Sequence, residues 1–174
     1  MFRTRKYKTF KVIKYYCFFS AAAALILNGI AYSQSLNFND ALSKAKSENK
    51  RVIVDVYTDW CGWCKKMDKE VYSNGKIKKL IDKNFILVKL DAESLMEVSY
   101  NGQQFTEQDL ALYFEASGYP TTVFLEQDGS VIEFMYNKTI MKNLPGYFKA
   151  GDFRKMLKFI KDGKYVDTDL TTIL

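Results

Sequence analysis

Residues 52–65 of the chain read VIVDVYTDWCGWCK. The first six residues form a near-continuous β-branched run, which is typical of a central strand covered on both faces of a sheet. The segment from Cys61 to Tyr72 follows with a helical pattern, in which Cys64, Met67 and Val71 share one side and lysines the other. A Cys-x-x-Cys pair between a strand and a helix indicates a redox-active dithiol.

The position of the pair at the start of a helix favours this chemistry. The sulfur of Cys61 would face unpaired backbone N–H groups and the positive end of the helix dipole, which favour the thiolate over the thiol. The thiolate is the attacking species in thiol–disulfide exchange, and Cys64 follows one turn later. We therefore predict that Cys61 is the nucleophile and that Cys64 resolves the mixed disulfide.

Three other roles for the pair compete with this interpretation. A zinc site needs two more good ligands, but the chain has no histidine and its third cysteine, Cys17, lies in the N-terminal segment. Covalent haem attachment requires a histidine directly after the pair, where this chain has Lys65. A purely structural disulfide stays open, although so short a loop constrains the unfolded chain weakly. We expect no metal and no cofactor beyond the Cys61–Cys64 pair.

Asp55 is the second informative residue, because an ionised carboxylate inside an apolar strand is costly to bury without compensation. In one interpretation it lies beneath the cysteine pair, where desolvation raises its pKa and it accepts the proton of Cys64. In the other it faces solvent on a half-exposed strand. Lys89, in the neighbouring predicted strand, is either its partner or a solvated charge. We favour the catalytic role.

Pro120 is the third informative residue. It directly precedes a predicted strand, Thr121 to Leu125, and a proline is tolerated only at the first position of such a strand. A cis peptide bond in a tight turn is one reason for a proline at this place.

The remaining pattern predicts an α/β domain with a mixed central sheet and helices on both faces. The order of elements is βα, βα, then a β-hairpin and a helix. The expected elements are a helix capped by Asn39, a second strand over Phe85 to Leu90, a hairpin centred on Asn101-Gly102, a helix opened by Thr106, antiparallel strands over Thr121 to Leu125 and Val131 to Tyr136, and a closing helix over Lys149 to Ile160.

The N-terminal segment has the pattern of a secretory signal peptide. Six basic residues precede residue 15, residues 15–27 carry no charge, and Ala31-Tyr32-Ser33 supplies small residues spaced by one. A membrane anchor is the alternative, but a spanning helix needs ~20 apolar residues and this run is shorter. We expect a signal peptide over residues 1–33 and a mature domain over residues 34–174, exported to the periplasm, or anchored in the membrane if the segment is not cleaved.

The charge of the chain argues against a nucleic-acid partner. The formal net charge is +6, with 26 basic and 20 acidic residues. The six basic residues of the N-terminal segment account for the whole excess, so the rest of the chain is neutral and presents no net attraction for a polyanion.

These motifs, in this order, resemble the thioredoxin superfamily over about residues 39–160. Within it the chain is most similar to exported thioredoxin-related proteins, the SoxW-like group, and to the C-terminal domain of DsbD-type thiol:disulfide interchange proteins. The resemblance implies a thioredoxin fold with Cys61 as nucleophile, Cys64 as resolving cysteine, Asp55 as the buried acid, and a cis peptide bond at Pro120. In the family this proline faces the dithiol and binds the substrate backbone. We expect a substrate-binding surface around the pair, formed by Trp60, Gly62, Trp63, Tyr119 and Pro120.

Two departures from the family matter. Gly62-Trp63 is not the Gly-Pro of thioredoxin or the Pro-His of the oxidase DsbA, so the direction of electron flow does not follow from the resemblance. The segment Glu93 to Phe105 is longer than a minimal thioredoxin needs. We expect a monomeric thiol:disulfide oxidoreductase that acts on proteins as a reductant and receives electrons from a membrane-embedded thiol donor. A non-catalytic protein-binding module and a disulfide-forming oxidase are the alternatives.

Overall fold

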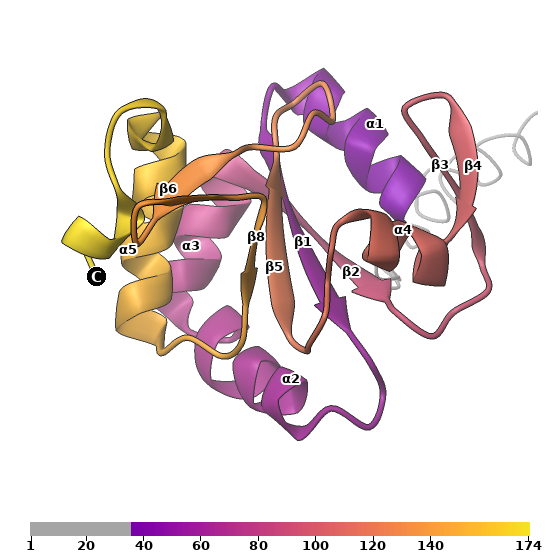
Figure 1. The fold of residues 1–174 in the computed structure, drawn as a ribbon, viewed down its shortest axis with the longest axis horizontal. Coiled ribbons are helices and arrows are strands. Elements are labelled where there is room, and N and C mark those ends of the chain that lie inside the picture. Colours follow the sequence, from indigo (N-terminus) through magenta and orange to yellow (C-terminus); the bar gives the residue numbers. More distant parts are fainter. Residues whose placement is uncertain (1–35) are drawn as a thin grey trace, which may run out of the picture. The chain divides into compact units, whose positions relative to one another are not determined.

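The fold is built on a four-stranded mixed sheet with the strand order β2-β1-β5-β8, shown in a computed structural model that describes residues 36–174 (Figure 1). The central strand β1 (Arg51–Tyr57) pairs in parallel with β2 (Phe85–Asp91) and antiparallel with β5 (Thr121–Leu125). At the other edge β5 pairs antiparallel with β8 (Asn143–Pro145). The predicted signal peptide lies outside the described residues.

Helices cover both faces of this sheet, as the sequence predicts (Figure 1). One face packs against α1 and α4, and the other against α2, α3 and α5. No helix within residues 36–174 has the length and apolar character needed to cross a membrane. The helices are α1 (Phe38–Glu48), α2 (Gly62–Met67), the π-helical turn η1 (Asp68–Tyr72), α3 (Gly75–Asn84), α4 (Glu107–Tyr113), α5 (Ala150–Lys161) and the 3₁₀ turns η2 (Lys164–Val166) and η3 (Leu170–Thr172).

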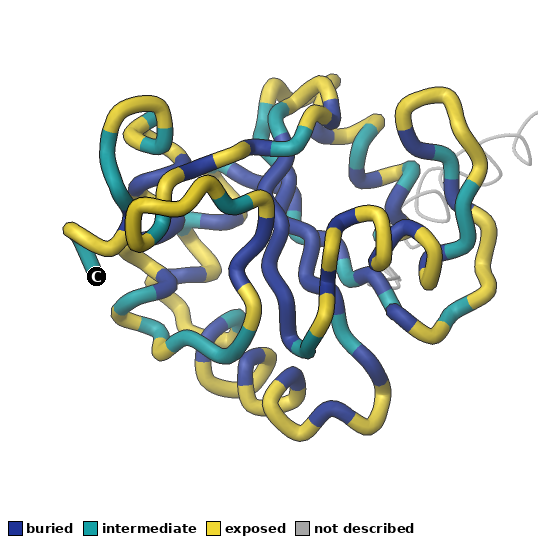
Figure 2. Tube along the Cα trace, viewed as in Figure 1, coloured by how far each residue is buried: buried dark blue, intermediate teal, exposed yellow. Residues whose placement is uncertain are grey.

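Strand β1 is buried on both faces because its side chains alternate between two hydrophobic cores (Figure 2). Val52, Val54 and Val56 enter the core under α1 and α4. Ile53 enters the core under α2, α3 and α5, and the alternation places Asp55 on the same face. The carboxylate therefore lies on the side of the sheet that α2 covers.

The predicted hairpin at Asn101-Gly102 is confirmed, with strands β3 (Glu97–Tyr100) and β4 (Gln103–Thr106). The predicted cap of α1 is wrong by two residues. Asn37 is the cap, and its Oδ1 accepts a hydrogen bond of 2.8 Å from the Asp40 N–H. The Asn39 amide instead pairs with the backbone of Ser99, at 2.6 and 3.2 Å, so it ties the hairpin to α1.

The predicted antiparallel pairing of Thr121–Leu125 with residues 131–136 is also wrong, apart from one bridge between Leu125 and Val131. Strand β8 occupies this edge of β5 along Thr121–Val123, so the returning chain pairs only with the end of β5, where the Ile132 N–H donates to the Phe124 carbonyl at 2.9 Å. The chain turns away after the bridge, and β6 (Phe134–Tyr136) pairs with β7 (Thr139–Met141) in a separate hairpin.

The helix predicted over Cys61 to Tyr72 changes its form part-way along. It is α-helical to Met67 and then makes one π-helical turn, η1, in which the Ser73 N–H bonds the Asp68 carbonyl. A π turn holds one more residue than an α turn and frequently marks a functional site. Here it lets Val71 enter the core while Asp68 reaches Lys89 on β2.

Arg51, at the start of β1, joins the sheet to the C-terminal segment. Its guanidinium bonds Glu126 at 2.9 Å, the Ile160 carbonyl at 2.6 Å and the Tyr165 hydroxyl at 3.1 Å. We expect Arg51→Ala to lower the free energy of unfolding by about 1–3 kcal/mol, because it leaves partly buried acceptors unpaired. Urea unfolding measures this value, with the exposed Lys44→Ala as control at less than about 0.5 kcal/mol. Equal losses in both variants would contradict the prediction.

Candidate active site

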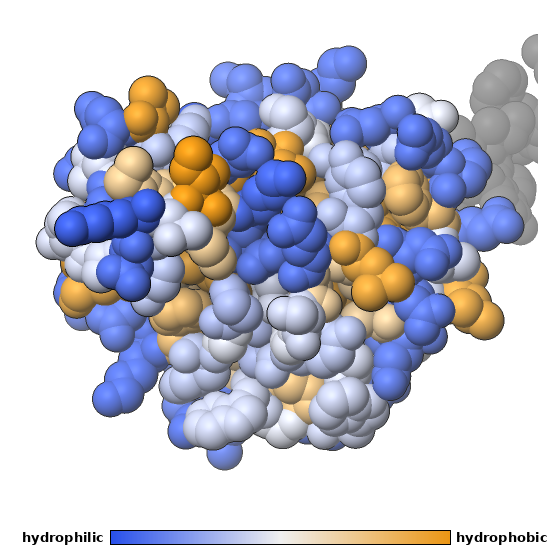
Figure 3. Space-filling model, in the orientation of Figure 1, coloured by the Kyte–Doolittle hydropathy of each residue, from blue (hydrophilic) through white to orange (hydrophobic). Residues whose placement is uncertain are grey.

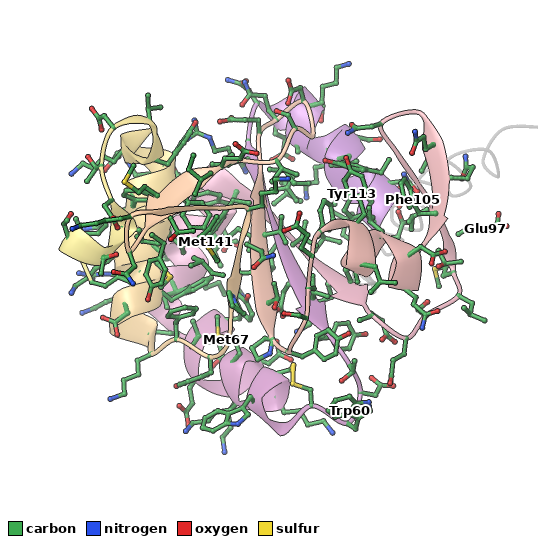
Figure 4. The ribbon with its side chains drawn as sticks, in the orientation of Figure 1. Trp60, Met67, Glu97, Phe105, Tyr113 and Met141 are labelled. Atoms are coloured by element: carbon green, nitrogen blue, oxygen red, sulfur yellow. A yellow bond between two sulfur atoms is a disulfide. The ribbon has the colours of Figure 1, made fainter. Side chains whose placement is uncertain are left out.

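The cysteine pair forms a disulfide at the N-terminus of α2, with an S–S distance of 2.06 Å (Figure 4). Cys61 is the N-cap of the helix, and its sulfur accepts a hydrogen bond of 3.0 Å from the Cys64 N–H. Both cysteines are buried, at 4% and 2% exposed, so exposure does not show which one is the nucleophile. The hydrogen bond from the Cys64 N–H favours Cys61, because it stabilises negative charge on the Cys61 sulfur.

Asp55 is completely buried, as the interpretation of it as a catalytic group requires. Burial raises the pKa of its carboxyl group from 3.8 to about 6, although Lys89 acts in the opposite direction. Lys89 stands directly across from Asp55 in the β1–β2 register, and its Nζ donates to Asp55 Oδ2 at 2.6 Å. The interpretation of Asp55 as a solvent-facing carboxylate is thus excluded for this structure.

Lys89 serves two carboxylates at once. Its Nζ also donates to Asp68 Oδ1 at 2.7 Å, and it lies 4.9 Å from the ring centre of Tyr57 and 5.7 Å from that of Tyr72. Burial lowers the pKa of this ammonium group, but the two carboxylates outweigh that effect and raise it. The group thus stays cationic and holds the buried Asp55 next to the half-exposed Asp68.

Pro120 follows a cis peptide bond, which is the geometry that the family resemblance implies. The residue is buried at the start of β5, and its carbonyl accepts a hydrogen bond of 2.7 Å from the Gly146 N–H. The turn is fixed further by the Thr121 hydroxyl, which donates to the Gly118 carbonyl at 2.6 Å. Gly146 has a φ of +96°, a conformation that favours glycine. Its hydrogen bond to the Pro120 carbonyl holds the loop before α5 against this turn.

Trp60 and Tyr119 form an aromatic pair on one side of the site. Trp60 is 68% exposed and points outward where α2 begins (Figure 4). Its ring packs edge-to-face against Tyr119 with centres 6.2 Å apart, and its indole N–H donates to Glu93 Oε1 at 2.9 Å. Glu93 belongs to the long segment between β2 and β4, so this segment fixes the orientation of the exposed tryptophan.

Trp63 and Tyr147 form a second aromatic pair. Trp63 is 57% exposed, and its ring centre lies 5.5 Å from that of Tyr147. The Lys66 ammonium lies 4.9 Å from the first ring centre and 5.0 Å from the second, within range of cation–π attraction. The Tyr147 hydroxyl donates to Glu70 at 2.7 Å. A charged side chain thus holds the second tryptophan in place.

The surface at this end of the molecule exposes two tryptophans, Trp60 and Trp63. In the space-filling view the lower part, around the start of α2, is mostly pale and of intermediate hydropathy (Figure 3). Gly62 lies between the two cysteines, and a Cβ atom at that position would meet no atom within 4 Å. Residue 62 therefore leaves the surface above the pair open.

Several residues of the site were not predicted. Glu93, Lys66 and Tyr147 are held by contacts between segments distant in sequence, or by aromatic geometry, which no local pattern encodes. Asp68 and Tyr72 have a recognisable signal, because they follow Cys64 by four and eight residues and thus share its side of a helix.

The family model of the thioredoxin-like domain matches residues 38–161 of this sequence. The chain belongs to the thioredoxin-like domain family. The match contains the cysteine pair, Asp55 and the cis Pro120, so the resemblance read from the sequence is confirmed, and with it the thioredoxin fold.

Two curated proteins are similar to parts of this thioredoxin-like chain. It is 33% identical over 86 residues to spermatogenesis-associated protein 20 of Mus musculus, which covers 49% of this chain and 10% of that protein. It is 22% identical over 139 residues to the thiol:disulfide interchange protein DsbD of Actinobacillus pleuropneumoniae, which covers 79% of this chain and 21% of that protein. The chain therefore spans about a fifth or less of the length of these relatives.

A solved thioredoxin-fold protein from Helicobacter pylori is similar to this thioredoxin-like chain in structure. The TM-score is 0.58 at 24% sequence identity, over 71% of this chain and 79% of that one. Similarity at this level of identity shows a shared fold.

Proposed function

We propose that this thioredoxin-like protein is a thiol:disulfide oxidoreductase that reduces disulfides in protein substrates. The observation that carries the proposal is the Cys61–Cys64 disulfide at a helix N-terminus, on the same side of the sheet as a buried carboxylate and accompanied by a cis proline. The similarity to DsbD, named as a thiol:disulfide interchange protein, supports the same chemistry.

The reaction transfers two electrons from the dithiol to the substrate. The Cys61 thiolate attacks one sulfur of the substrate disulfide, which forms a mixed disulfide and releases one substrate thiolate. Cys64 then gives its proton to Asp55, and its thiolate attacks the Cys61 sulfur. This step closes the Cys61–Cys64 disulfide and releases the second substrate thiolate, and both thiolates take up protons.

The raised pKa of Asp55 suits it to accept that proton. An ordinary thiol has a pKa of about 8.5. Burial moves the pKa of the carboxyl group from 3.8 to about 6. The gap between acceptor and donor is thus roughly halved, which lowers the free-energy cost of proton transfer.

We propose that both aromatic pairs contribute to substrate binding. Trp60 with Tyr119, and Trp63 with Tyr147, are fixed by neighbours and leave the position above Gly62 open. An extended substrate segment next to Pro120 would contact both pairs. We propose that Trp60, Gly62, Trp63, Tyr119 and Pro120 form the substrate-binding surface.

We propose reduction rather than oxidation as the direction of electron flow. Strong oxidants stabilise the thiolate of their reduced form heavily. Here the charged cluster of Asp55, Lys89 and Asp68 carries a net charge of −1 once Asp55 is ionised, and a nearby negative charge disfavours a further thiolate. The chain also has no histidine that could stabilise the thiolate as a cation.

After each turnover the Cys61–Cys64 disulfide of a reductant must be reduced again to the dithiol. We propose a membrane-embedded thiol donor as its electron source, and export of the domain to the periplasm through residues 1–33. We propose that the protein acts as a monomer in this reaction cycle.

The redox potential tests the direction. We expect a potential near thioredoxin's, about −270 mV, when the domain is equilibrated with glutathione buffers. The fluorescence of Trp60 and Trp63, which directly precede Cys61 and Cys64, reports the state of the disulfide. A potential above roughly −150 mV would place the protein with the oxidants, whose potentials lie near about −120 mV, and would contradict the proposal.

A further inference from the structure

Tyr72 places a hydroxyl group in the core beside the candidate active site. It is the last residue of the π turn η1, eight residues after Cys64. Its ring packs edge-to-face on Phe153 with centres 5.5 Å apart, and the Lys89 ammonium lies 5.7 Å from its ring centre. The hydroxyl oxygen is buried and has no hydrogen-bond partner among residues 36–174.

Two more oxygens without partners belong to the same region. In the described part of the chain, Asp55 Oδ1 and Thr122 Oγ1 are also buried and unpaired. Thr122 stands directly across from Asp55 in the β1–β5 register, as Lys89 does in the β1–β2 register. Buried polar groups are almost always hydrogen-bonded, and an unpaired one is costly. One unpaired carboxylate oxygen and two unpaired hydroxyl oxygens in the same part of the core therefore indicate a functional arrangement.

The chemistry of these groups assigns the donor. Burial and the Asp55 charge raise the pKa of the Tyr72 hydroxyl well above its usual range, so it keeps its proton at every physiological pH. A carboxylate can only accept hydrogen bonds. Burial raises the pKa of Asp55, and the ion pair with Lys89 lowers it. A hydrogen bond donated by the Tyr72 hydroxyl would lower this pKa further.

We propose that Tyr72 is a positioning residue. Its hydroxyl, unpaired in this structure, donates to the Asp55 carboxylate once Asp55 is ionised, and so sets the pH at which Asp55 takes the Cys64 proton. This inference rests on the function proposed for Asp55. The titratable and polar groups around Asp55 are Lys89 from β2, Asp68 and Tyr72 from η1, and Thr122 from β5. Tyr72 is a neutral hydrogen-bond donor. Replacing it with phenylalanine removes only its hydroxyl group.

The test is Tyr72→Phe, which keeps the ring on Phe153 and removes the hydroxyl. Loss of a donor to the charged form raises the pKa of a carboxyl group. We expect the midpoint of the pH dependence of mixed-disulfide resolution to move up by about one pH unit. Tyr100→Phe is the matched control, because its buried hydroxyl bonds the Gly129 carbonyl away from the site, and its midpoint should not move.

A second readout separates this inference from the proposed function. Titration of the Asp55 carboxyl group by ¹³C NMR needs no turnover, and we expect the same upward shift there in Tyr72→Phe. An unchanged Asp55 titration would overturn the role of Tyr72, even in an active enzyme. If the wild-type protein did not reduce disulfides at all, that result would overturn the proposed function instead.

Two further variants complete the test. In the Asp55→Asn background, Tyr72→Phe should cause no shift in the pH profile, and a shift of equal size there would overturn the proposal. Thr122→Val removes the other unpaired hydroxyl at nearly constant shape. A larger shift of the Asp55 titration in Thr122→Val than in Tyr72→Phe would assign the donor to Thr122 and would likewise overturn it.

Discussion

Replacing Cys64 with serine should leave substrate proteins covalently attached to Cys61, whereas replacing Cys61 with serine should reduce both attachment and turnover to background. The geometry gives the reason. Cys61 caps α2 and its sulfur accepts the Cys64 N–H at 3.0 Å, so the thiolate forms more readily at Cys61. A serine at position 64 cannot attack the mixed disulfide, and the covalent complex persists.

The measurement is non-reducing electrophoresis after acid quenching, with both variants incubated with the same disulfide-containing substrates. Alkylation of the reduced wild-type protein near pH 7 gives an independent check, since Cys61 should react first. Equal trapping by the two variants, or equal alkylation rates, would show that the roles of the two cysteines are not those assigned here.

Much of the fold could be predicted because its signals are local. The apolar run of β1, the Cys-x-x-Cys pair after it and the Asn101-Gly102 turn each specify their own structure within a few residues. The burial of Asp55 was predictable for the same reason, because apolar residues precede and follow it in the strand.

The features that were missed depend on which segments meet. The turn after β5 does form, but the predicted hairpin does not continue, because β8 returns from a distant part of the sequence to occupy that edge. Likewise the fixed orientation of Trp60 depends on Glu93, and the role of Lys89 depends on the π turn that brings Asp68 to it. A lysine at the end of a strand has no local mark that distinguishes a buried ion pair from a solvated charge.

The second large effect is expected in Asp55→Asn. Resolution of the mixed disulfide should slow by roughly a hundredfold at pH 7, because Cys64 loses its proton acceptor and general base catalysis contributes at least about that factor. The pH profile should also lose its rise near pH 6, which reflects ionisation of Asp55. Rapid mixing of the mixed disulfide with buffers from pH 5 to 9 measures both. A rate that matches wild type across this range would exclude Asp55 as the acceptor.

The same substitution should make the protein more stable. The pKa of Asp55 is about 6 in the folded protein and 3.8 in the unfolded chain, so between these values the folded state binds more protons and wild-type stability falls as the pH rises. Above about pH 6 the full cost is present, about 3 kcal/mol from the pKa difference. Because Asn also leaves Lys89 with Asp68 alone, we expect a net gain of about 1–3 kcal/mol at pH 8 and almost none at pH 4. Urea unfolding at both pH values tests the sign. A variant that is slower in resolution yet more stable would identify Asp55 as a group kept for its chemistry at the expense of the fold, whereas a variant that is both slower and less stable would identify it as a structural partner of Lys89.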